Sequence, residues 1–208
     1  MSAENDLLVI ALVVLALLIA LGWYLSYSAA RLDRLHAKVE GAMSVLDAQL
    51  VRRAEASLEL ATSGALDPAS SLILADAASG AIRRRTEHPI GDDPLDGQHF
   101  AGREGVESDL SSALATVLSD DQQAVLRGND GDPVGREALE RVEASALRVQ
   151  LARQFHNDAV AQVRRVRAKT VVRVFRLAGH AALPDLVDFD DRLPGDRKST
   201  RLNSSHVS

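Results

Sequence analysis

The feature that most constrains this chain is an unbroken apolar run of 19 residues, Leu7–Leu25, which contains no charged side chain. As an α-helix, a segment of this length extends about 28 Å, close to the roughly 30 Å hydrocarbon thickness of a bilayer. A backbone surrounded by lipid must satisfy its own hydrogen bonds, and a helix does so within one segment. Trp23 and Tyr24 stand at the C-terminal edge of the run, where amphipathic rings favour the headgroup layer. The sequence therefore predicts one membrane-spanning helix over residues 7–27.

This segment has two interpretations, a retained anchor and a cleaved secretory signal. A signal peptide has a basic n-region and a shorter apolar core, whereas residues 1–6 contain two acidic side chains and no Lys or Arg. Ser26 and Ser28 nevertheless fit the small-x-small pattern of a cleavage site. We favour the anchor, with residues 1–6 as a short extracytoplasmic N-terminus. Positive charge follows the span and none precedes it, so the positive-inside rule places the rest of the chain in the cytoplasm; the deciding cations are Arg31, Arg34 and Lys38.

The remaining chain has the pattern of an all-α protein. Apolar residues recur every three or four positions, which is one face of a helix, and aromatic residues make up only 3% of the chain. We expect about four long helices: from the membrane to about Leu60, from Pro68 to Arg85, from Glu104 to Leu118, and from Val134 to about Ala178. Loops over 89–103 and 127–132 alternate between the ends, so an antiparallel bundle over residues 28–182 is the expected fold.

The apolar stripes predict which side chains of the second and last helices face the core. For the second helix these are Leu72, Ile73, Leu74, Ala77 and Ile82. For the last helix they are Leu139, Val142, Ala146, Val149, Phe155, Ala159, Val163, Val166, Val171 and Val174. Residues 183–195 are rich in acidic side chains, and we expect a polar tail there.

The last thirteen residues of the chain resemble a foreign sequence, and they are also polar and without a helical period. Asp196–His206 reads DRKSTRLNSSH and resembles the conceptual translation of a sequencing-library adapter. We therefore leave residues 196–208 out of the argument about the fold, as is appropriate for foreign or processed segments.

Two segments carry a family resemblance. Ala42–Glu55 reads AMSVLDAQLVRRAE, and Ala152–Val160 reads ARQFHNDAV. In this order, and after an N-terminal anchor, they resemble the LemA family of bacterial membrane proteins. Val171–Asp191 is similar to the C-termini of actinobacterial members. The resemblance implies an all-helical, largely antiparallel bundle on one transmembrane helix, and it implies no established catalytic activity.

The chain also departs from the family pattern at three places. After Arg53 the family usually continues with an Ile-Pro-Asn type of turn, whereas this chain has Ala54, Glu55 and Ala56. His156 stands where a Tyr is usual, and the Phe-Pro that normally follows the last helix is missing. A ligand surface shared with the family at these positions is therefore not expected.

Two groups of polar side chains are candidates for an inter-helix polar network. They are Gln49, Arg52 and Arg53 on the first helix, and Asn157 and Asp158 on the last. If these helices are antiparallel neighbours, an Arg–Asp pair with amide hydrogen bonds would determine their register, and buried networks of this kind specify packing. The alternatives are an ordinary solvated surface and a functional site.

We expect no catalytic, cofactor-binding or metal-binding site. His156 and Asp158 are two positions apart, and such residues do not face each other on a helix. The chain has no Cys, which excludes disulfides and thiolate metal sites. It also has no glycine-rich phosphate loop, nucleophile elbow or zinc-ligand spacing. The sequence therefore predicts a protein that is not an enzyme and has no cofactor.

Two basic clusters stand near the ends of the second and last helices. Their members are Arg83, Arg84 and Arg85, and Arg164, Arg165, Arg167, Lys169, Arg173 and Arg176. They can be solvated helix faces, partner surfaces, or contacts to anionic headgroups, where each cation contributes about 1 kcal/mol. Nucleic acid is not an expected partner, because the net charge is −5 and aromatic stacking residues are missing nearby. Both helices run back toward the membrane in an antiparallel bundle, so we expect both clusters to face one leaflet.

These features predict a membrane-anchored scaffold or interaction module at the inner face of a bacterial cell membrane. Its expected partners are the lipid bilayer, an unidentified membrane or cytoplasmic protein, and a second copy of the chain. The alternative is an accessory subunit of a membrane protease, a transporter or an envelope-stress system. The sequence does not distinguish the two.

Overall fold

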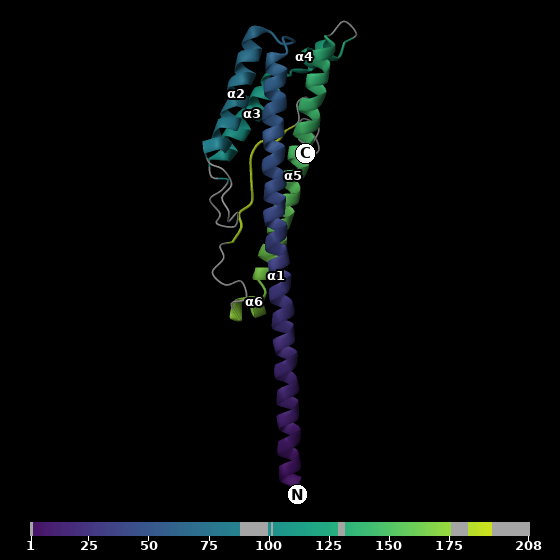
Figure 1. The fold of residues 1–208 in the computed structure, drawn as a ribbon, viewed down its shortest axis with the longest axis vertical. Coiled ribbons are helices and arrows are strands. Elements are labelled where there is room, and N and C mark those ends of the chain that lie inside the picture. Colours follow the sequence, from purple (N-terminus) through teal and green to yellow (C-terminus); the bar gives the residue numbers. More distant parts are fainter. Residues whose placement is uncertain (1, 88–99, 101, 129–131, 176–182, 193–208) are drawn as a thin grey trace, which may run out of the picture.

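The computed structural model describes residues 2–87, 100, 102–128, 132–175 and 183–192. These residues form an all-α protein, and no strand occurs among them. Figure 1 shows the helices α1 (Ser2–Thr62), α2 (Pro68–Glu87), α3 (Arg103–Val117), α4 (Asp120–Arg127), α5 (Pro133–Arg167) and α6 (Thr170–Val174). The four long helices are those that the sequence predicts. The two short ones, α4 and α6, are additional.

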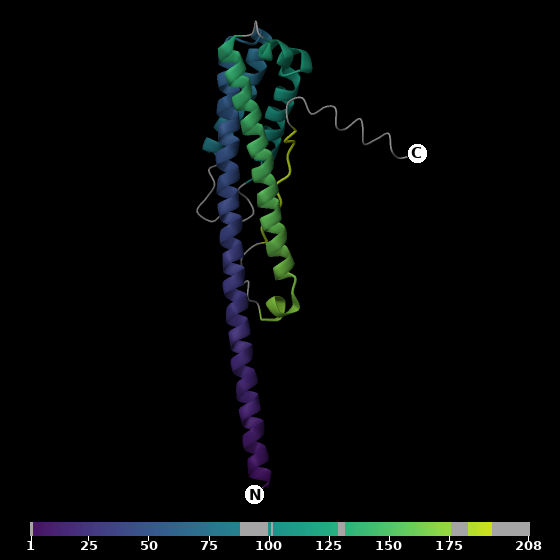
Figure 2. The same ribbon diagram turned by 90° about the vertical axis from the view of Figure 1, so that its right-hand side faces the viewer.

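Helix α1 continues without a break from the apolar segment into the bundle. It is 61 residues long, and its residues Asn5–Thr62 form one helix that is long and apolar enough to be a candidate membrane span. The apolar side chains before Trp23 are exposed, and in both ribbon views this part of α1 stands clear of the other helices (Figures 1 and 2). The bundle is therefore built directly onto the candidate span.

The pairing of α1 with α5 is the main contact of the bundle. Along α1 from Leu32 to Leu60, the buried partners on α5 run from Val166 back to Leu139. Partner numbers that fall as α1 numbers rise make the two helices antiparallel. Helix α2 packs against α1, and α3 packs against α2. The expected antiparallel arrangement of the long helices is thus present.

Local signals explain where α1, α2 and α5 meet. Gly64 adopts a φ of 80° after α1, a backbone conformation that favours glycine. Asp67 Oδ1 accepts hydrogen bonds from the amides of Ala69 and Ser70, and thereby caps α2. A Cβ atom built on Gly135, in the first turn of α5, would lie 2.4 Å from the Cβ of Ala65. A glycine at this position therefore lets α5 approach the α1–α2 turn closely.

Several residues that were expected to face the core are exposed instead. In α2, Leu72 and Ile73 are exposed, and the buried residues are Leu74, Ala78 and Ala81. In α5, Phe155 is 66% exposed while its neighbour His156 is buried. A run of consecutive apolar residues does not define one helix face by itself, and the packing of α1 against the small Ala152 and Ala159 selects the face that contains His156.

The last long helix is shorter than expected. Helix α5 ends at Arg167, and the chain turns at Ala168 and Lys169 before α6. Val172 of α6 is buried against Leu32 and Val166, whereas Val174 is exposed. The predicted end at Ala178 lies outside the described residues. The break places α6 beside α1 rather than extending α5 along it.

Two segments expected to be polar and exposed contribute to the core instead. In the predicted loop 89–103, Phe100 and Arg103 are buried, while residues 89–99 lie outside the described part. In the predicted polar tail, Val187, Phe189 and Asp191 are buried, so residues 183–192 are not a solvated tail. Residues 193–208, which include the adapter-like stretch, lie outside the described part.

Candidate functional site

A buried ionic network joins α1 to α3. Arg53 of α1 donates from Nη2 to Oε2 of Glu107 at 2.8 Å and from Nη1 to Oγ of Ser111 at 2.9 Å. Both charged side chains are almost fully buried. Taking charges out of water is costly unless they are paired and hydrogen-bonded. Because α1 and α3 have few other contacts, this pair contributes directly to the position of α3 on α1.

A second ion pair extends the network toward α2. Arg103, at the first position of α3, donates to Oδ1 of Asp47 at 2.6 Å and has a guanidinium nitrogen 3.8 Å from Oε1 of Glu107. Asp47 also accepts from Nε of Arg85 at 3.3 Å. Alternating positive and negative side chains therefore link α1, α2 and α3. Because these charged groups pair with one another, the network fixes the relative positions of the three helices.

Two aromatic rings lie over this network. Phe100 and Phe189 stack with their centroids 6.4 Å apart. The guanidinium of Arg103 lies 5.1 Å from the ring centre of Phe100, and those of Arg53 and Arg153 lie 5.8 and 5.6 Å from the ring centre of Phe189. Cations at such distances from a ring face are attracted by its quadrupole. The rings thus shield the arginines from water and at the same time interact favourably with their positive charges.

Residues 183–192, which we name the docked segment, lie between α3 and α5 and form hydrogen bonds with both helices. They are drawn in yellow in Figures 1 and 2. Burial alternates along Val187, Asp188 and Phe189, as in an extended chain whose side chains point alternately to two sides. The segment is also linked to the Arg53–Glu107 pair through Ser111. The hydroxyl of Ser111 accepts from Arg53 and donates to the Asp190 carbonyl.

The predicted polar network is only partly assembled. Arg53 pairs with Glu107 of α3, and Asp158 is exposed on α5, so the expected Arg–Asp pair does not form. Asn157 bonds to the backbone of Val187 instead. Gln49 is half-buried, and Arg52 is exposed beside an open groove between α1 and α5. The residues that sequence reasoning missed are Asp47, Arg103, Glu107, Ser111 and the docked segment.

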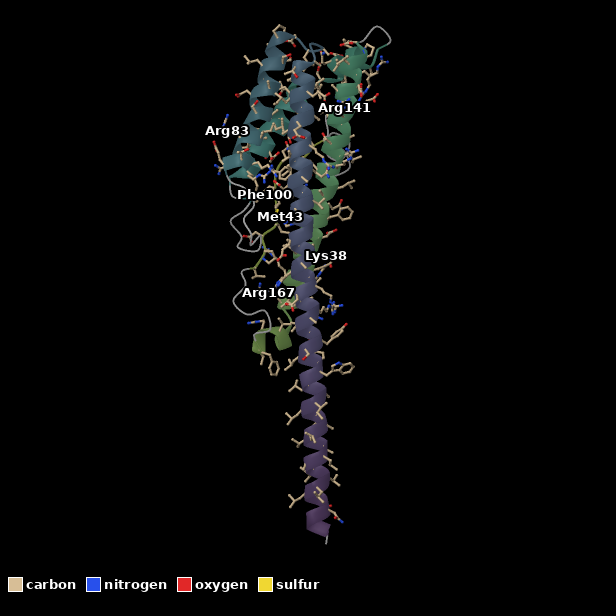
Figure 3. All side chains as sticks on the ribbon, viewed as in Figure 1. Lys38, Met43, Arg83, Phe100, Arg141 and Arg167 are labelled. Carbon is tan, nitrogen blue, oxygen red and sulfur yellow. The ribbon has the colours of Figure 1, made fainter. Side chains whose placement is uncertain are left out.

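The basic clusters do not share one level of the bundle. Arg85 pairs with Asp47, which is 22 residues beyond Leu25 and therefore about 33 Å along α1. By contrast, α6 contacts Leu32, seven residues beyond Leu25 and about 10 Å along the helix. Figure 3 shows Arg83 far above Arg167. The expectation that both clusters face one leaflet is thus wrong, because α2 is too short to reach the end of the bundle nearest the span.

The second cluster is itself divided between different partners. Arg164 donates to the carbonyl of Pro184 at 3.0 Å and to Asp185 at 2.8 Å, so it holds the docked segment. Arg165, Lys169 and Arg173 are exposed, and Arg176 lies outside the described residues. The cations near α6 are therefore the solvent-exposed part of this cluster.

Two histidines between α1 and α5 have surroundings that lower their pKa. Burial lowers the pKa of His156, and the backbone of Asp185 opposes this shift. Burial also lowers the pKa of His36, and the nearby positive charge of Arg167 lowers it further. No group of three His, Asp or Glu side chains that could hold a metal ion occurs in the described ranges. His156 is buried in the core, whereas His36 is half-buried.

An open groove lies beside Arg52, between α1 and α5. It is open to solvent and lined by acidic, basic and small side chains of α1 and α5. Its lining residues are Arg52, Glu55, Ala56, Glu59, Glu137, Glu140, Arg141, Ala144, Ser145 and Arg148. An open groove of mixed charge lacks the apolar enclosure of a small-molecule site.

Comparisons of the chain with protein-family models, with curated proteins and with solved structures find no match.

Proposed function

We propose that this chain is a LemA-like, membrane-anchored helical scaffold without enzymatic activity, held at the inner face of a bacterial cell membrane. The observation that carries the proposal is the continuity of α1, which is both the candidate span and the central helix of the bundle. A helix without an interruption between Leu25 and Leu32 transmits orientation, so the bundle stands on the membrane instead of hanging from a linker. This geometry suits a protein that presents surfaces at a set height above a bilayer.

The placement of the two family-like segments supports the proposed relationship. Ala42–Glu55 lies on α1 and Ala152–Val160 lies on α5. Their side chains Met43, Leu46 and Ala152 belong to one core cluster. When two segments pack against each other, the side chains of one must fit those of the other. This is a physical reason for the two motifs to occur in the same chain.

The end of the bundle near the span supports a role at the lipid surface. Val174 and Phe175 are exposed apolar side chains, and Lys169 and Arg173 are exposed cations beside them. Apolar and basic side chains together favour the boundary between headgroups and acyl chains of anionic bilayers. We therefore assign lipid contact to α6 and not to the α2 cluster.

Sidedness tests the anchored orientation. The chain has no native Cys, so two single cysteines at exposed positions can report on the two sides of the membrane. Asn5→Cys lies before the apolar segment of α1, and Ser112→Cys lies on α3 of the bundle. We expect a membrane-impermeant maleimide to label Asn5→Cys in intact cells and Ser112→Cys only after permeabilisation. Labelling of Ser112→Cys in intact cells would reverse the orientation. A mature chain that has lost Asn5→Cys and leaves the membrane fraction would support the cleaved signal instead.

Lipid contact by α6 is tested with an environment-sensitive fluorophore on Val174→Cys. In nanodiscs that contain anionic lipid we expect its emission to shift to the blue relative to neutral discs, because Lys169 and Arg173 draw α6 onto the headgroups. Changing both cations to Gln is expected to abolish the shift. Arg83→Gln is the matched control, because this cation lies on the far cluster and its loss leaves the shift intact. Equal emission in neutral and anionic discs would rule out the contact.

A further inference from the structure

The face of the α1–α5 pair that contains the open groove is not covered by another helix of the described part of the chain. All residues that line the groove belong to α1 and α5. In Figure 3, Arg83 on α2 and Arg141 on α5 lie on opposite sides of α1. The exposed side chains of α1 and α5 around the groove therefore form a surface of their own, which we name the α1–α5 face.

An apolar band crosses the α1–α5 face on the side of the groove nearer the membrane-spanning segment. Arg52 and Arg148 line the groove, and Val45 and Phe155 stand seven residues from them along α1 and α5. Seven residues are close to two helical turns, so both apolar side chains share the face of the groove. With Leu151, the exposed fractions in this band are 53%, 66% and 44% for Val45, Phe155 and Leu151. Apolar side chains exposed together mark a surface that binds another molecule.

The register of the two helices places the apolar side chains of the band at one level. Lys38 donates from Nζ to Oε1 of Gln162 at 3.2 Å. Val45 stands seven residues after Lys38 on α1, and Phe155 stands seven residues before Gln162 on α5. Because the helices are antiparallel, these equal steps lead to the same level of the bundle. The band therefore extends over both helices.

Charged side chains flank the apolar band, and on each flank the two helices carry opposite charges. Beyond the band are Glu55 of α1 and Arg148 of α5, and nearer the membrane-spanning segment are Lys38 of α1 and Asp158 of α5, all exposed. The two members of each pair lie within about one turn of the same level. An identical face turned by 180° about an axis along the helices would place α1 of one copy against α5 of the other. Glu55 would then meet Arg148, and Lys38 would meet Asp158, so the face is complementary to itself.

We infer that the α1–α5 face binds the same face of a second copy that stands beside it in the membrane. Charge complementarity is the first reason, and the height of the band is the second. Val45 lies 20 residues beyond Leu25 on one continuous helix, which is about 30 Å, so the bands of two anchored copies lie at the same height. This inference rests on the proposed anchoring, because anchoring makes the copies parallel.

The dimer has the arrangement of a four-helix bundle. Helices α1 and α5 of each copy are antiparallel, and α1 of one copy is also antiparallel to α5 of the other, as in bundles whose neighbouring helices alternate in direction. The apolar bands meet at the centre of this bundle. Arg52 is the one unfavourable member, because it comes level with Arg148 of the second copy. Replacing Arg52 with Gln is therefore expected to strengthen the dimer.

Single cysteines in the full-length chain test the contact in isolated membranes. Ala48→Cys is exposed on α1, one turn from Val45. A chain with one cysteine cannot be cross-linked to itself, so every product of a bis-maleimide contains two molecules. We expect a dimer from Ala48→Cys and at least tenfold less from Leu72→Cys, the matched control, which is 72% exposed on α2. Adding Phe155→Glu to Ala48→Cys is expected to lower the dimer yield at least tenfold, whereas adding Leu72→Glu leaves it unchanged.

Reversing one charge in each of two chains tests which helices meet. Both chains carry Ala48→Cys and different tags, and one has Arg148→Glu while the other has Glu55→Arg. Each homodimer then brings like charges together at both contacts, whereas the mixed dimer keeps opposite charges at both. We expect the mixed dimer to exceed either homodimer at least fivefold. Ion pairs confined to single chains would give no such preference.

The outcomes separate this dimer from other partners and from failure of the anchor. Circular dichroism shows whether each variant is folded, and Leu151→Glu is the second variant should Phe155→Glu unfold. A yield that is insensitive to both variants, or a mixed dimer that is not preferred, would overturn the inference. Cross-linking of Ala48→Cys only to a different membrane protein would assign the face to that protein instead. Loss of the dimer from chains that stay in the membrane fraction rejects the interface alone, whereas chains absent from that fraction contradict the anchored scaffold as well.

Discussion

Replacing Arg53 with Ala is expected to destabilise the protein by about 3–5 kcal/mol, the range for removing one partner of a buried ion pair. The loss is large because Glu107 stays buried in α3 and keeps only the more distant Arg103, 3.8 Å away, opposite its charge, and because Ser111 loses its guanidinium donor. For a chain of this size the corresponding fall in melting temperature is on the order of 10 °C. Thermal unfolding followed by circular dichroism in detergent measures it.

Arg52→Ala is the matched control for this prediction. Arg52 is the adjacent arginine on the same helix but is exposed, and surface substitutions usually change stability by less than about 0.5 kcal/mol. The double change Arg53→Met with Glu107→Leu is expected to recover most of the loss, because apolar residues of similar volume often replace buried ion pairs without cost. Equal melting temperatures for Arg52→Ala and Arg53→Ala would show that Arg53 is not buried against Glu107.

Replacing Leu46 with Ala is expected to cost about 2–5 kcal/mol, as for other large-to-small changes in cores. Leu46 is fully buried where α1 meets α5, in one cluster with Leu50 and Val149. The change removes apolar burial and leaves a cavity that neighbouring helices fill only in part. Urea unfolding of the detergent-solubilised chain gives the free energy directly.

Val45→Ala is the control for the face that α1 presents. Val45 precedes Leu46 and is 53% exposed, so its truncation is expected to leave stability within about 0.5 kcal/mol of the native chain. Consecutive residues on a helix point about 100° apart. If Val45→Ala were the more damaging change, α1 would be rotated by one residue relative to the arrangement described above.

Local sequence patterns predicted where the helices begin more accurately than they predicted which side of each helix is buried. The Asp67-Pro68 and Asp132-Pro133 signals mark the starts of α2 and α5 as the structure has them, because a cap and a missing amide act within one turn. The choice between Phe155 and His156 follows from which side of α5 meets α1. Both residues fit a helical stripe, so the periodicity alone leaves that choice open.

The candidate site was predicted even less completely, for a related reason. Arg53 was identified as a network residue, but its partner Glu107 lies 54 residues away on α3, and no short-range pattern links the two. The signal that was available is Glu107 itself, a charged side chain that stands one turn from Leu110 on the inward stripe of α3. A carboxylate at such a position requires a buried cation.

The sequence by itself determined the all-α class, the apolar segment and the order of the four long helices, because each depends on interactions within about one helical turn. Only the tertiary structure decided the partner of Arg53, the height of the two basic clusters and the burial of residues 183–192. These depend on which segments meet in space. An acidic stretch such as Asp188–Asp191 is polar by composition, and it is buried in part because a groove of amide, hydroxyl and guanidinium groups satisfies its backbone and charges.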